Sequence, residues 1–377
     1  MSVIIKQVLE KKQLKDFIEF PNRLYAGVPW FVPKIYIDEM NTLSPDRNPA
    51  FAFSEAAYFL AYKDSRIVGR IAAIINKRAN KKWNHNEVRY GWFDFEDDPE
   101  VSAALLEKVG EFGRLRGMDT IVGPLGFTDF DAEGMLVEGF DQISTMALNF
   151  NFPYYMQHME RMGYEKTVDW LEYRITIPEK LPDRIPRVAK LVSERYGFHV
   201  RKLTRKEVQK EGYGHKIFDL INECYGSLYN FTPLDKKMID KYIGTYLGFV
   251  DFNLIAVVED GQGQMLGFGI MIPSIVQALR KCGGKLFPFG WIQVVRSMYF
   301  NHEEGVELLL IGVRPEYRNK GILAMIFNDL VPRLIEQGFK WADSNAELET
   351  NMSMRNPWEM FDYVQNKRRR IYKKSLK

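Results

Sequence analysis

The sequence predicts a mixed α/β chain in which one fold is used twice, and three observations lead to this prediction. The chain has 377 residues, which is more than one hydrophobic core usually organises. Strand-like and helix-like segments alternate along it. Their order repeats after a proline-bearing stretch at 177–186. We therefore expect two domains, covering residues 1–176 and 177–377.

Composition excludes several classes of protein. With 46% hydrophobic and 27% charged residues, the chain is ordinary for a globular protein. A net charge of +3 does not by itself indicate a nucleic-acid partner. The two cysteines and five histidines lack the spacing of metal ligands, so we expect no metal. Without a signal peptide or a long apolar run, we expect a cytoplasmic protein with no stable membrane anchor.

The first half reads as strands with two helices. Its strand-like runs cover residues 57–63, 66–76, 89–95, 119–125 and 169–177. A helix is expected after the third run. Asp98 is a suitable N-cap residue, Pro99 is favoured at the first helical position, and Gly117 is suited to the C-terminal end of the helix. Another helix is expected near 154–166.

The second half repeats this order with an insertion. Its strand-like runs cover residues 198–204, 253–260, 264–275, 306–313 and 340–348. A helical region occupies about 205–247, and a further helix runs from Gly321 to Gln337 and ends at Gly338. The insertion at 276–301 has two amphipathic stretches around a Gly-Gly break, and we interpret it as a lid or an interdomain helix pair.

The two halves differ where the central strand meets its helix. In the first half "FDFEDDPEV" makes this junction with five acidic residues and no glycine. In the second half it reads "GVRPEYRNKGILA". A helix N-terminus leaves about four backbone N–H groups unpaired and carries positive potential, which suits a pyrophosphate. Arg318 and Lys320 add charge, and Gly321 would let the ligand approach the backbone. The alternative to an anion-binding site is an ordinary surface turn that caps the helix.

This junction resembles motif A of the GNAT superfamily of acyl-CoA-dependent N-acyltransferases. The family pattern is a strand, V-x-P-x-x-[RQ]-x-x-G-x-[GA], and a helix. Val313, Pro315, Arg318 and Gly321 match it, while Leu323 stands where a small residue is usual. The resemblance implies two tandem GNAT-like domains, each a mixed, mostly antiparallel sheet flanked by helices. The first would lack the CoA turn.

The resemblance also implies a site for acetyl-CoA or another acyl-CoA. The pyrophosphate would lie on the amides of about 319–324, and the pantetheine along a strand that splays from its neighbour at 340–348. Backbone N–H groups would hold the thioester oxygen. The implied contact residues are Ile311, Gly312, Val313, Arg318, Asn319, Lys320, Gly321, Ile322, Leu323, Ala324 and Asn351.

Candidates for the proton transfers are Glu307 and Tyr363. Glu307 lies eleven residues before Arg318, a spacing that resembles the general base of some family members. It is roughly 16 Å upstream of Gly312 in extended backbone, so it would act through water. The alternative is a half-exposed strand carboxylate. In family members the general acid is often a tyrosine, and Tyr363 is the tyrosine of this sequence nearest to the expected position. Alternatively, Tyr363 is a residue of the hydrophobic core.

Cys224 could carry an acyl group during the reaction. A cysteine buried in a helix, without a chemical role, is the simpler interpretation.

The first half contains an unusual acidic loop. In "GPLGFTDFDAEGMLVEGFD", Asp129, Asp131 and Glu133 follow a buried strand, where α/β sheets hold ligands. These carboxylates could bind a cationic amine, or they could belong to an ordered, turn-rich loop. "VPWFVP", "VGRIAAIIN", this loop and "RRRIYKKSL" together resemble a bacterial family with two tandem GNAT-like domains, a resemblance that brings no substrate with it.

We therefore expect an acyl-CoA-dependent N-acyltransferase whose acceptor is a small-molecule amine or a protein amine. A CoA-binding or regulatory protein without catalysis is one alternative. An aminoacyl- or peptidyl-type transferase is another, and it would need a basic groove for RNA that the modest charge does not favour. The sequence names neither the acceptor, the acyl length nor the oligomeric state.

Overall fold

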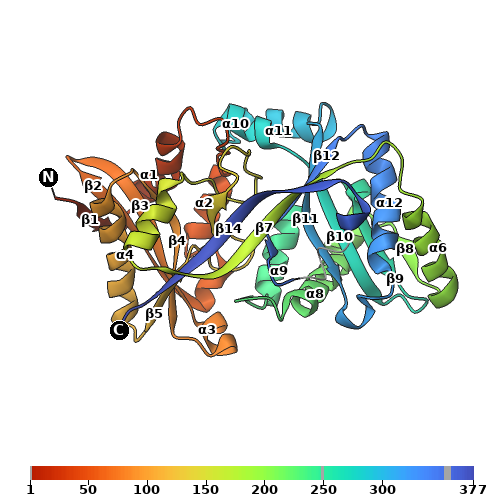
Figure 1. The fold of residues 1–377 in the computed structure, drawn as a ribbon, viewed down its shortest axis with the longest axis horizontal. Helices are drawn as coiled ribbons and strands as arrows, with labels where there is room; N and C mark the ends of the chain where they lie inside the picture. The colour runs from red at the N-terminus through yellow and green to blue at the C-terminus, as the bar shows by residue number, and fades with distance from the viewer. Residues whose placement is uncertain (1, 248–249, 352–357) are drawn as a thin grey trace. The chain divides into compact units, whose positions relative to one another are not determined.

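The computed structural model describes residues 2–247, 250–351 and 358–377 (Figure 1). Its contacts group into two units. Unit 1 comprises Met1–Leu171, Val276–Val295 and Asn366–Lys377, and unit 2 comprises Glu172–Ile275 and Arg296–Gln365. The strands β7 (Glu165–Thr176) and β14 (Tyr363–Ser375) have residues in both units. The units are not contiguous in sequence, and the domain boundary after residue 176 stays a prediction.

Unit 1 contains a sheet in the order β1-β2-β3-β4-β5-β14. Its strands, besides β14, are β1 (Ile4–Gln7), β2 (Ser54–Lys63), β3 (Arg66–Asn76), β4 (Glu87–Phe95) and β5 (Thr120–Gly123). Neighbours pair antiparallel except β4 and β5, which are parallel. The short β6 (Met135–Glu138) also pairs with β14.

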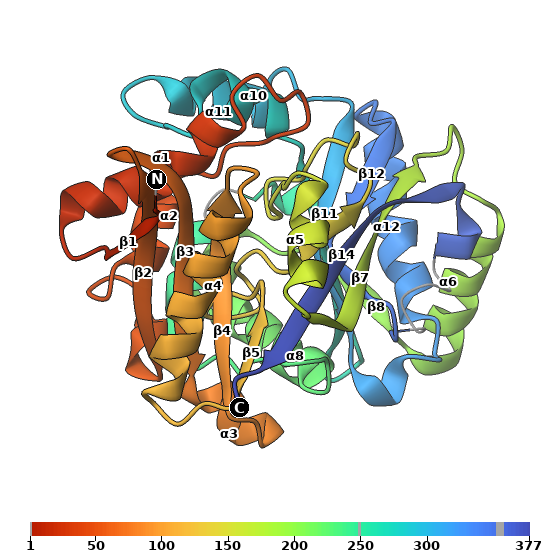
Figure 2. The same cartoon turned by 60° about the vertical axis from the view of Figure 1, so that its left-hand side comes forward.

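Helices cover both faces of this sheet. They are α1 (Lys11–Leu24), α2 (Tyr36–Leu43), α3 (Lys77–Trp83), α4 (Pro99–Arg114), α5 (Tyr154–Arg161) and α10 (Val276–Cys282). Figure 2 shows α4 running along β3 and β4, where Gly69 leaves room for Leu105 and Val101 of the helix. The next residue, Arg70, points to the opposite face and lies over the Phe17 ring of α1.

The predicted start of α4 is confirmed. Asp98 is its N-cap, and the Asp98 side chain accepts a hydrogen bond from the backbone N–H of Glu100 at 2.9 Å. Pro99 occupies the first turn. A carboxylate here satisfies one unpaired N–H and complements the helix dipole. The helix ends at Arg114, and Gly117 follows with a φ of 75°.

Unit 2 contains strands in the order β8-β9-β10-β11-β12-β7. Its other strands are β8 (His199–Arg201), β9 (Ile255–Glu259), β10 (Met265–Pro273), β11 (Gly305–Val313) and β12 (Trp341–Ser344), with β13 (Glu347–Leu348) pairing with β7. Neighbours are antiparallel except β11 and β12. Both units therefore have the mixed, mostly antiparallel sheet that the sequence predicts.

The helices of unit 2 are α6 (Arg184–Tyr196), α7 (Arg205–Lys210), α8 (Tyr213–Tyr225), α9 (Lys236–Tyr242) and α12 (Ile322–Glu336), and α11 (Gly290–Tyr299) has residues in both units. Helix α12 packs against α6 and the sheet, as Figure 1 shows. Gly267 and Gly269 of β10 face α12, and Gly312 of β11 faces α8. Within the described ranges, none of the helices has the length and apolar character needed to traverse a bilayer.

A buried carboxylate connects β7 to β14 in unit 1. Asp169 is fully buried and accepts hydrogen bonds from Arg370 Nε at 2.8 Å and Arg368 Nη1 at 3.1 Å, with Lys166 Nζ at 3.1 Å. Burial alone would raise the pKa of Asp169, but these cations outweigh it and the pKa is lowered. The ionised form therefore stabilises the folded state.

We expect Asp169→Asn to lower the free energy of unfolding by about 3 kcal/mol at pH 7, since the guanidinium groups lose their buried counter-ion. The stabilisation is present above an unfolded pKa of about 3.9 and is lost as the pH falls through the lower folded value. Urea unfolding at pH 7 and at acidic pH should show the difference shrinking. The exposed Asp141→Asn in the same unit is the control. Equal stability of Asp169→Asn and wild type at pH 7 would contradict this role.

Candidate functional site

Strand β11 leaves its neighbour β12 halfway along its length. The parallel pairing runs from Gly305 opposite Trp341 to Leu308 opposite Ser344, where β12 ends. One residue later, Asn345 Nδ2 donates to the Leu309 carbonyl at 3.0 Å. The short β13 pairs with β7 instead of β11. The predicted splay is thus confirmed, and the edge of β11 beyond Leu309 has no β12 partner in the described part of the chain.

A β-bulge lies at the same point. Ile270 of β10 is opposite Leu310, whereas Met271 is opposite Leu308, so Leu309 is an extra residue in β11. A bulge bends its strand and shifts which face the following side chains point to. Residues five apart on a regular strand point to opposite faces. The extra residue brings Glu307 and Gly312 onto the same face, because their partners on β10, Ile272 and Phe268, are four apart.

This shared face is the one that α8 covers. A Cβ added at Gly312 would lie 3.3 Å from Cys224 Sγ on α8. Glu307 is 3% exposed, so it is buried rather than half-exposed. In the register of β11 and β12, Glu307 is opposite Asp343, whose carboxylate forms two hydrogen bonds of 2.8 Å with Arg174. A buried carboxylate therefore lies upstream of the splayed edge, on the side that carries Gly312.

The turn between β11 and α12 presents unpaired amides. Helix α12 begins at Ile322 with Gly321 as N-cap, and no side chain caps it. Five residues of this turn have backbone N–H groups that form no hydrogen bond with any other described residue. They are Asn319, Gly321, Ile322, Leu323 and Ala324. Leu323 is partly exposed beside two buried neighbours. Such a cluster of N–H groups at a helix N-terminus can bind an anion.

Gly321 is required for a different reason than the one predicted. Its φ is 78°, in the left-handed region that favours glycine. A Cβ at this position would meet Val192 Cγ2 of α6 at 2.6 Å. The space that glycine leaves open is therefore occupied by α6, so Gly321 fixes the turn and its packing on that helix.

The three cations of the turn have different partners. Arg314 forms an ion pair with Glu223 at 2.8 Å. Arg318 Nη2 donates to the Cys224 carbonyl at 3.1 Å, at the C-terminal end of α8. Lys320 Nζ lies 4.3 Å from the centre of the Tyr317 ring, and within the described residues it has no carboxylate at ion-pair distance. Lys320 thus keeps its charge available to a ligand.

Two residues at the end of α8 reach β11. Cys224 is buried, and burial raises its pKa to about 12, which disfavours the nucleophilic thiolate. This confirms the interpretation of Cys224 as a buried helix cysteine. Tyr225 donates its hydroxyl to the Ile311 carbonyl at 2.9 Å, on the splayed stretch of β11. Sequence reasoning missed Tyr225, since nothing in a helical region of the sequence shows which residue will reach a strand 86 positions away.

The expected general acid lies at the start of β14. Tyr363 is 40% exposed and packs edge-on against Tyr173 with ring centres 5.6 Å apart, so it is not a core residue. The backbone N–H of Asn351 donates to the Leu348 carbonyl at 2.9 Å, and residues 352–357 lie outside the described ranges. Trp358 is buried and donates to Glu347 Oε1 at 3.0 Å. The roles of Tyr363 and Asn351 stay predictions.

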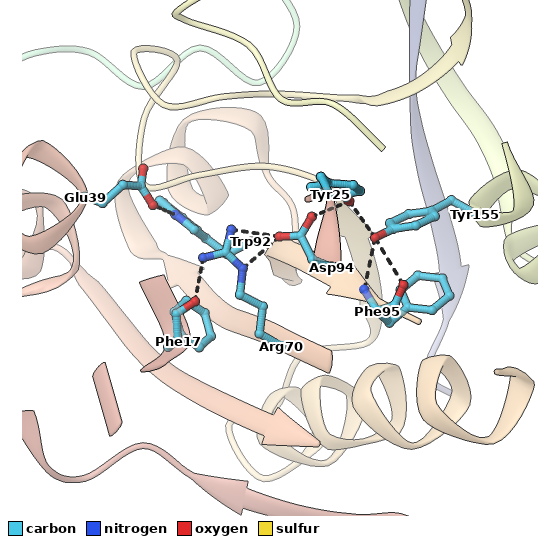
Figure 3. A network of polar contacts seen from close by, with 8 residues as sticks. All are labelled: Phe17, Tyr25, Glu39, Arg70, Trp92, Asp94, Phe95 and Tyr155. Atoms are coloured by element: carbon cyan, nitrogen blue, oxygen red, sulfur yellow. Dashed lines mark hydrogen bonds and ion pairs between the residues drawn. The ribbon is translucent and has the colours of Figure 1, made fainter. Parts of the chain in front are cut away.

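In unit 1 the corresponding strand end is filled by side chains (Figure 3). Tyr155 of α5 bonds through its hydroxyl to the backbone N–H of Phe95 at 3.0 Å and to the Tyr25 hydroxyl at 2.7 Å. Tyr25 in turn donates to Asp94 at 2.8 Å, and Asp94 also accepts from Arg70 Nε at 2.7 Å. The end of β4 thus has its polar groups engaged by a buried network, and the following helix is capped by an acidic residue.

The network also borders a small polar pocket of unit 1. Glu39 accepts a hydrogen bond from Trp92 Nε1 at 2.6 Å, and burial raises the pKa of Glu39 despite the nearby Arg70. Asn22 and Lys34 also line this pocket. Carboxylates and cations balance each other here, so the pocket does not favour a ligand of either charge.

The acidic loop of unit 1 brings its three carboxylates together. Asp131 Oδ2 accepts from the backbone N–H groups of Phe127 at 2.7 Å and Thr128 at 3.1 Å, as in a tight, ordered turn. Burial raises the pKa of Glu133, and Asp129 and Asp131 raise it further. Asp131 therefore organises the loop, and amine binding by these residues stays a prediction.

Among the described residues no group of histidine, cysteine or carboxylate side chains is placed to hold a metal ion.

Comparisons with known proteins agree with this architecture. Protein YghO of Escherichia coli (strain K12) is 26% identical over 382 residues, which is 99% of this chain and 95% of its own length. Bacterial ceramide synthase of Caulobacter vibrioides (strain NA1000 / CB15N) is 25% identical over 371 residues, covering 97% of this chain and 95% of that protein. No family model matches the chain.

Solved structures define the fold. A tandem GNAT protein from the clavulanic acid biosynthesis pathway superposes with a TM-score of 0.58 at 10% identity, covering 100% of this chain and 99% of its own. A GCN5-related N-acetyltransferase from Sphaerobacter thermophilus gives a TM-score of 0.51 at 11% identity, with 100% and 96% coverage. The chain therefore has the tandem GNAT fold that the sequence resemblance implied.

We expect the two cysteines to differ in reactivity. Cys224 is buried with a raised pKa, whereas Cys282 on α10 is only partly buried. A disulfide reagent at pH 8 should therefore label about one thiol per folded chain and both after unfolding in urea, because the thiolate is the reacting form. The Cys282→Ser variant should give almost no fast reaction in the folded state. Rapid labelling of Cys224 in that variant would show that its thiol is accessible.

Proposed function

We propose that the chain is an acyl-CoA-dependent N-acyltransferase with its CoA site in unit 2. The observation that carries this proposal is the uncapped start of α12, where five backbone N–H groups have no described partner. In the same unit, β11 offers a splayed edge that leads directly into the turn. A pyrophosphate on the amides of 319–324 would place the pantetheine arm beside Ile311, Gly312 and Val313.

The reaction follows from this placement. The amine nitrogen attacks the thioester carbon, and the oxygen that becomes negative is held by backbone N–H groups of the free edge of β11. The amine must lose a proton, and Glu307 takes it through an ordered water. The carbon–sulfur bond then breaks, and CoA leaves as a thiolate or, with a proton from a tyrosine hydroxyl, as a thiol. Tyr363 and Tyr225 are the two hydroxyl candidates.

Tyr225 joins these candidates because of where its hydroxyl lies. It is bonded to the Ile311 carbonyl, within the strand segment that would contact the ligand. The hydroxyl has a single hydrogen, so the bond to the Ile311 carbonyl would have to break before Tyr225 could protonate the departing sulfur, and burial raises the pKa of Tyr225. Tyr363 is 40% exposed, so packing constrains the position of its hydroxyl less. Separate Tyr225→Phe and Tyr363→Phe variants compare the two.

The name of a relative guides the choice of acyl group and acceptor to test. The Caulobacter protein is named a ceramide synthase, and making a ceramide joins a fatty acyl group to the amine of a long-chain amino alcohol. We therefore propose that long-chain acyl-CoAs and lipid amines be tested beside acetyl-CoA and small polyamines. An activity confined to acetyl-CoA would assign the chain to short-chain acetyl transfer.

CoA binding is tested by a charge reversal at the turn. We expect Lys320→Glu to weaken acyl-CoA binding about tenfold or more in calorimetric titration, because it places a carboxylate beside the pyrophosphate and removes no ion pair. Lys340→Glu makes the same change beyond the opposite end of α12, where the side chain is exposed, and should bind like wild type. If both variants bind acyl-CoA like wild type, the anion site at the turn does not exist.

Catalysis is tested at Glu307. Thiol release from acyl-CoA in the presence of amines should fall by about 100-fold in kcat for Glu307→Gln, while acyl-CoA binding is kept. Glu304→Gln, an exposed carboxylate three residues away, should turn over like wild type. Full turnover by Glu307→Gln would remove this residue from the mechanism. Acyl-CoA binding without thiol release for any amine would indicate a CoA-binding protein that does not catalyse transfer.

A further inference from the structure

A short segment of unit 1 exposes several large apolar side chains that are close together in sequence. Phe287 is 74% exposed, Phe289 72%, Trp291 45% and Ile292 47%. We call these four residues the 287–292 patch. Single exposed apolar side chains are ordinary on a protein surface, whereas a contiguous aromatic group marks an interaction site. The patch is located on the connection between α10 and α11 and in the first turn of α11.

The backbone beneath the patch is held in place. The N–H of Tyr36 donates to the Gly284 carbonyl at 2.9 Å, and Lys285 forms an ion pair with Glu19 at 2.9 Å. Gly284 has a φ of 74°, and a Cβ there would meet the Lys34 carbonyl at 2.0 Å, so only glycine allows this close approach. The segment is thus fastened to the loop before α2 while its rings remain exposed.

The indole ring of Trp291 is held by hydrogen bonds. The backbone N–H of Trp291 donates to the Leu286 carbonyl at 2.8 Å, and its indole Nε1 donates to the Pro288 carbonyl at 3.1 Å. These bonds orient the indole ring within the patch. An aromatic side chain that is already held in its exposed position loses little conformational entropy when it binds.

The charged residues close to the patch in sequence are all cations. Residues 261–302 contain four cations and no aspartate or glutamate. The cations are Arg280, Lys281, Lys285 and Arg296. Lys281 is exposed, and neither it nor Arg280 has a described carboxylate partner. Aromatic side chains favour the interfacial region of a bilayer, and nearby lysine and arginine are attracted to anionic lipid headgroups.

We propose that the 287–292 patch docks the protein reversibly on an anionic lipid bilayer. Phe287 and Phe289 would enter the boundary between headgroups and acyl chains, with Trp291 at headgroup level and Arg280 and Lys281 against the anionic lipids. Four apolar side chains and two cations without carboxylate partners would bind the protein to the membrane surface reversibly. This is a weaker attachment than the stable membrane anchor that the sequence does not predict. A second copy of the chain would oppose cations to cations at this surface, so charge favours the bilayer.

Vesicle binding tests the proposal. The full chain is sedimented with vesicles of phosphatidylcholine alone and with vesicles containing equal phosphatidylcholine and phosphatidylglycerol. We expect binding to the anionic vesicles, and the double variant Phe287→Ser, Phe289→Ser should weaken it about tenfold or more. The control Leu115→Ser changes an 83% exposed residue after α4 in the same unit and should bind like wild type. Lys281→Glu should weaken binding to the anionic vesicles.

A spectroscopic reading separates insertion from charge attraction. Brominated lipids should quench tryptophan fluorescence of the wild type, and Trp291→Phe should lose most of that quenching because this indole is the one that would meet the bilayer. Absence of binding to anionic vesicles would overturn the proposal. So would a wild-type dimer in light scattering that the Phe287→Ser, Phe289→Ser variant converts to a monomer, since a second copy would then cover the patch.

Discussion

The candidate site depends on a single extra residue in β11. Leu309 forms a bulge against β10, and this shift gives Glu307 and Gly312 a common face. The bulge coincides with the end of β12, so the strand is bent and loses its parallel neighbour at one point. The free backbone edge and the turn that starts α12 both follow from that departure. Without the extra residue, Glu307 and Gly312 would point to opposite faces of the sheet.

The two units differ in side chains more than in backbone. Both central strands, β4 and β11, have nine residues, pair in parallel with the next strand over a few positions, and carry an irregularity against their antiparallel neighbour. In unit 1 the end of β4 contacts two tyrosines, and Asp98 caps the following helix. In unit 2 a glycine begins the helix, and its amides stay open. The same architecture thus has its polar groups bonded internally at the strand end of unit 1, whereas in unit 2 backbone N–H groups stay available at the start of the helix.

The sequence predicted features that depend on neighbouring residues. The N-cap at Asp98, the glycine that begins α12 and the repeated order of strands and helices are local, and they are confirmed. Contacts between distant segments could not be predicted this way. The burial of Glu307 depends on its register with β10 and β12, and the hydrogen bond from Tyr225 depends on how α8 crosses β11. Likewise, α6 rather than a ligand fills the space beside Gly321, because Val192 lies far away in sequence.

Strand β14 has a consequence for how the chain folds during synthesis. Its residues complete the sheet of unit 1 by pairing with β5, for example Tyr372 opposite Gly123, and its arginines neutralise the buried Asp169. On the ribosome, this strand emerges only after all the strands of unit 2's own sheet have been made. Domains usually fold from the N-terminus as they appear. Here the first unit lacks the strand partner of β5 and the arginine partners of Asp169 until the second has been translated, so chaperone binding during that interval would protect the exposed edge of β5.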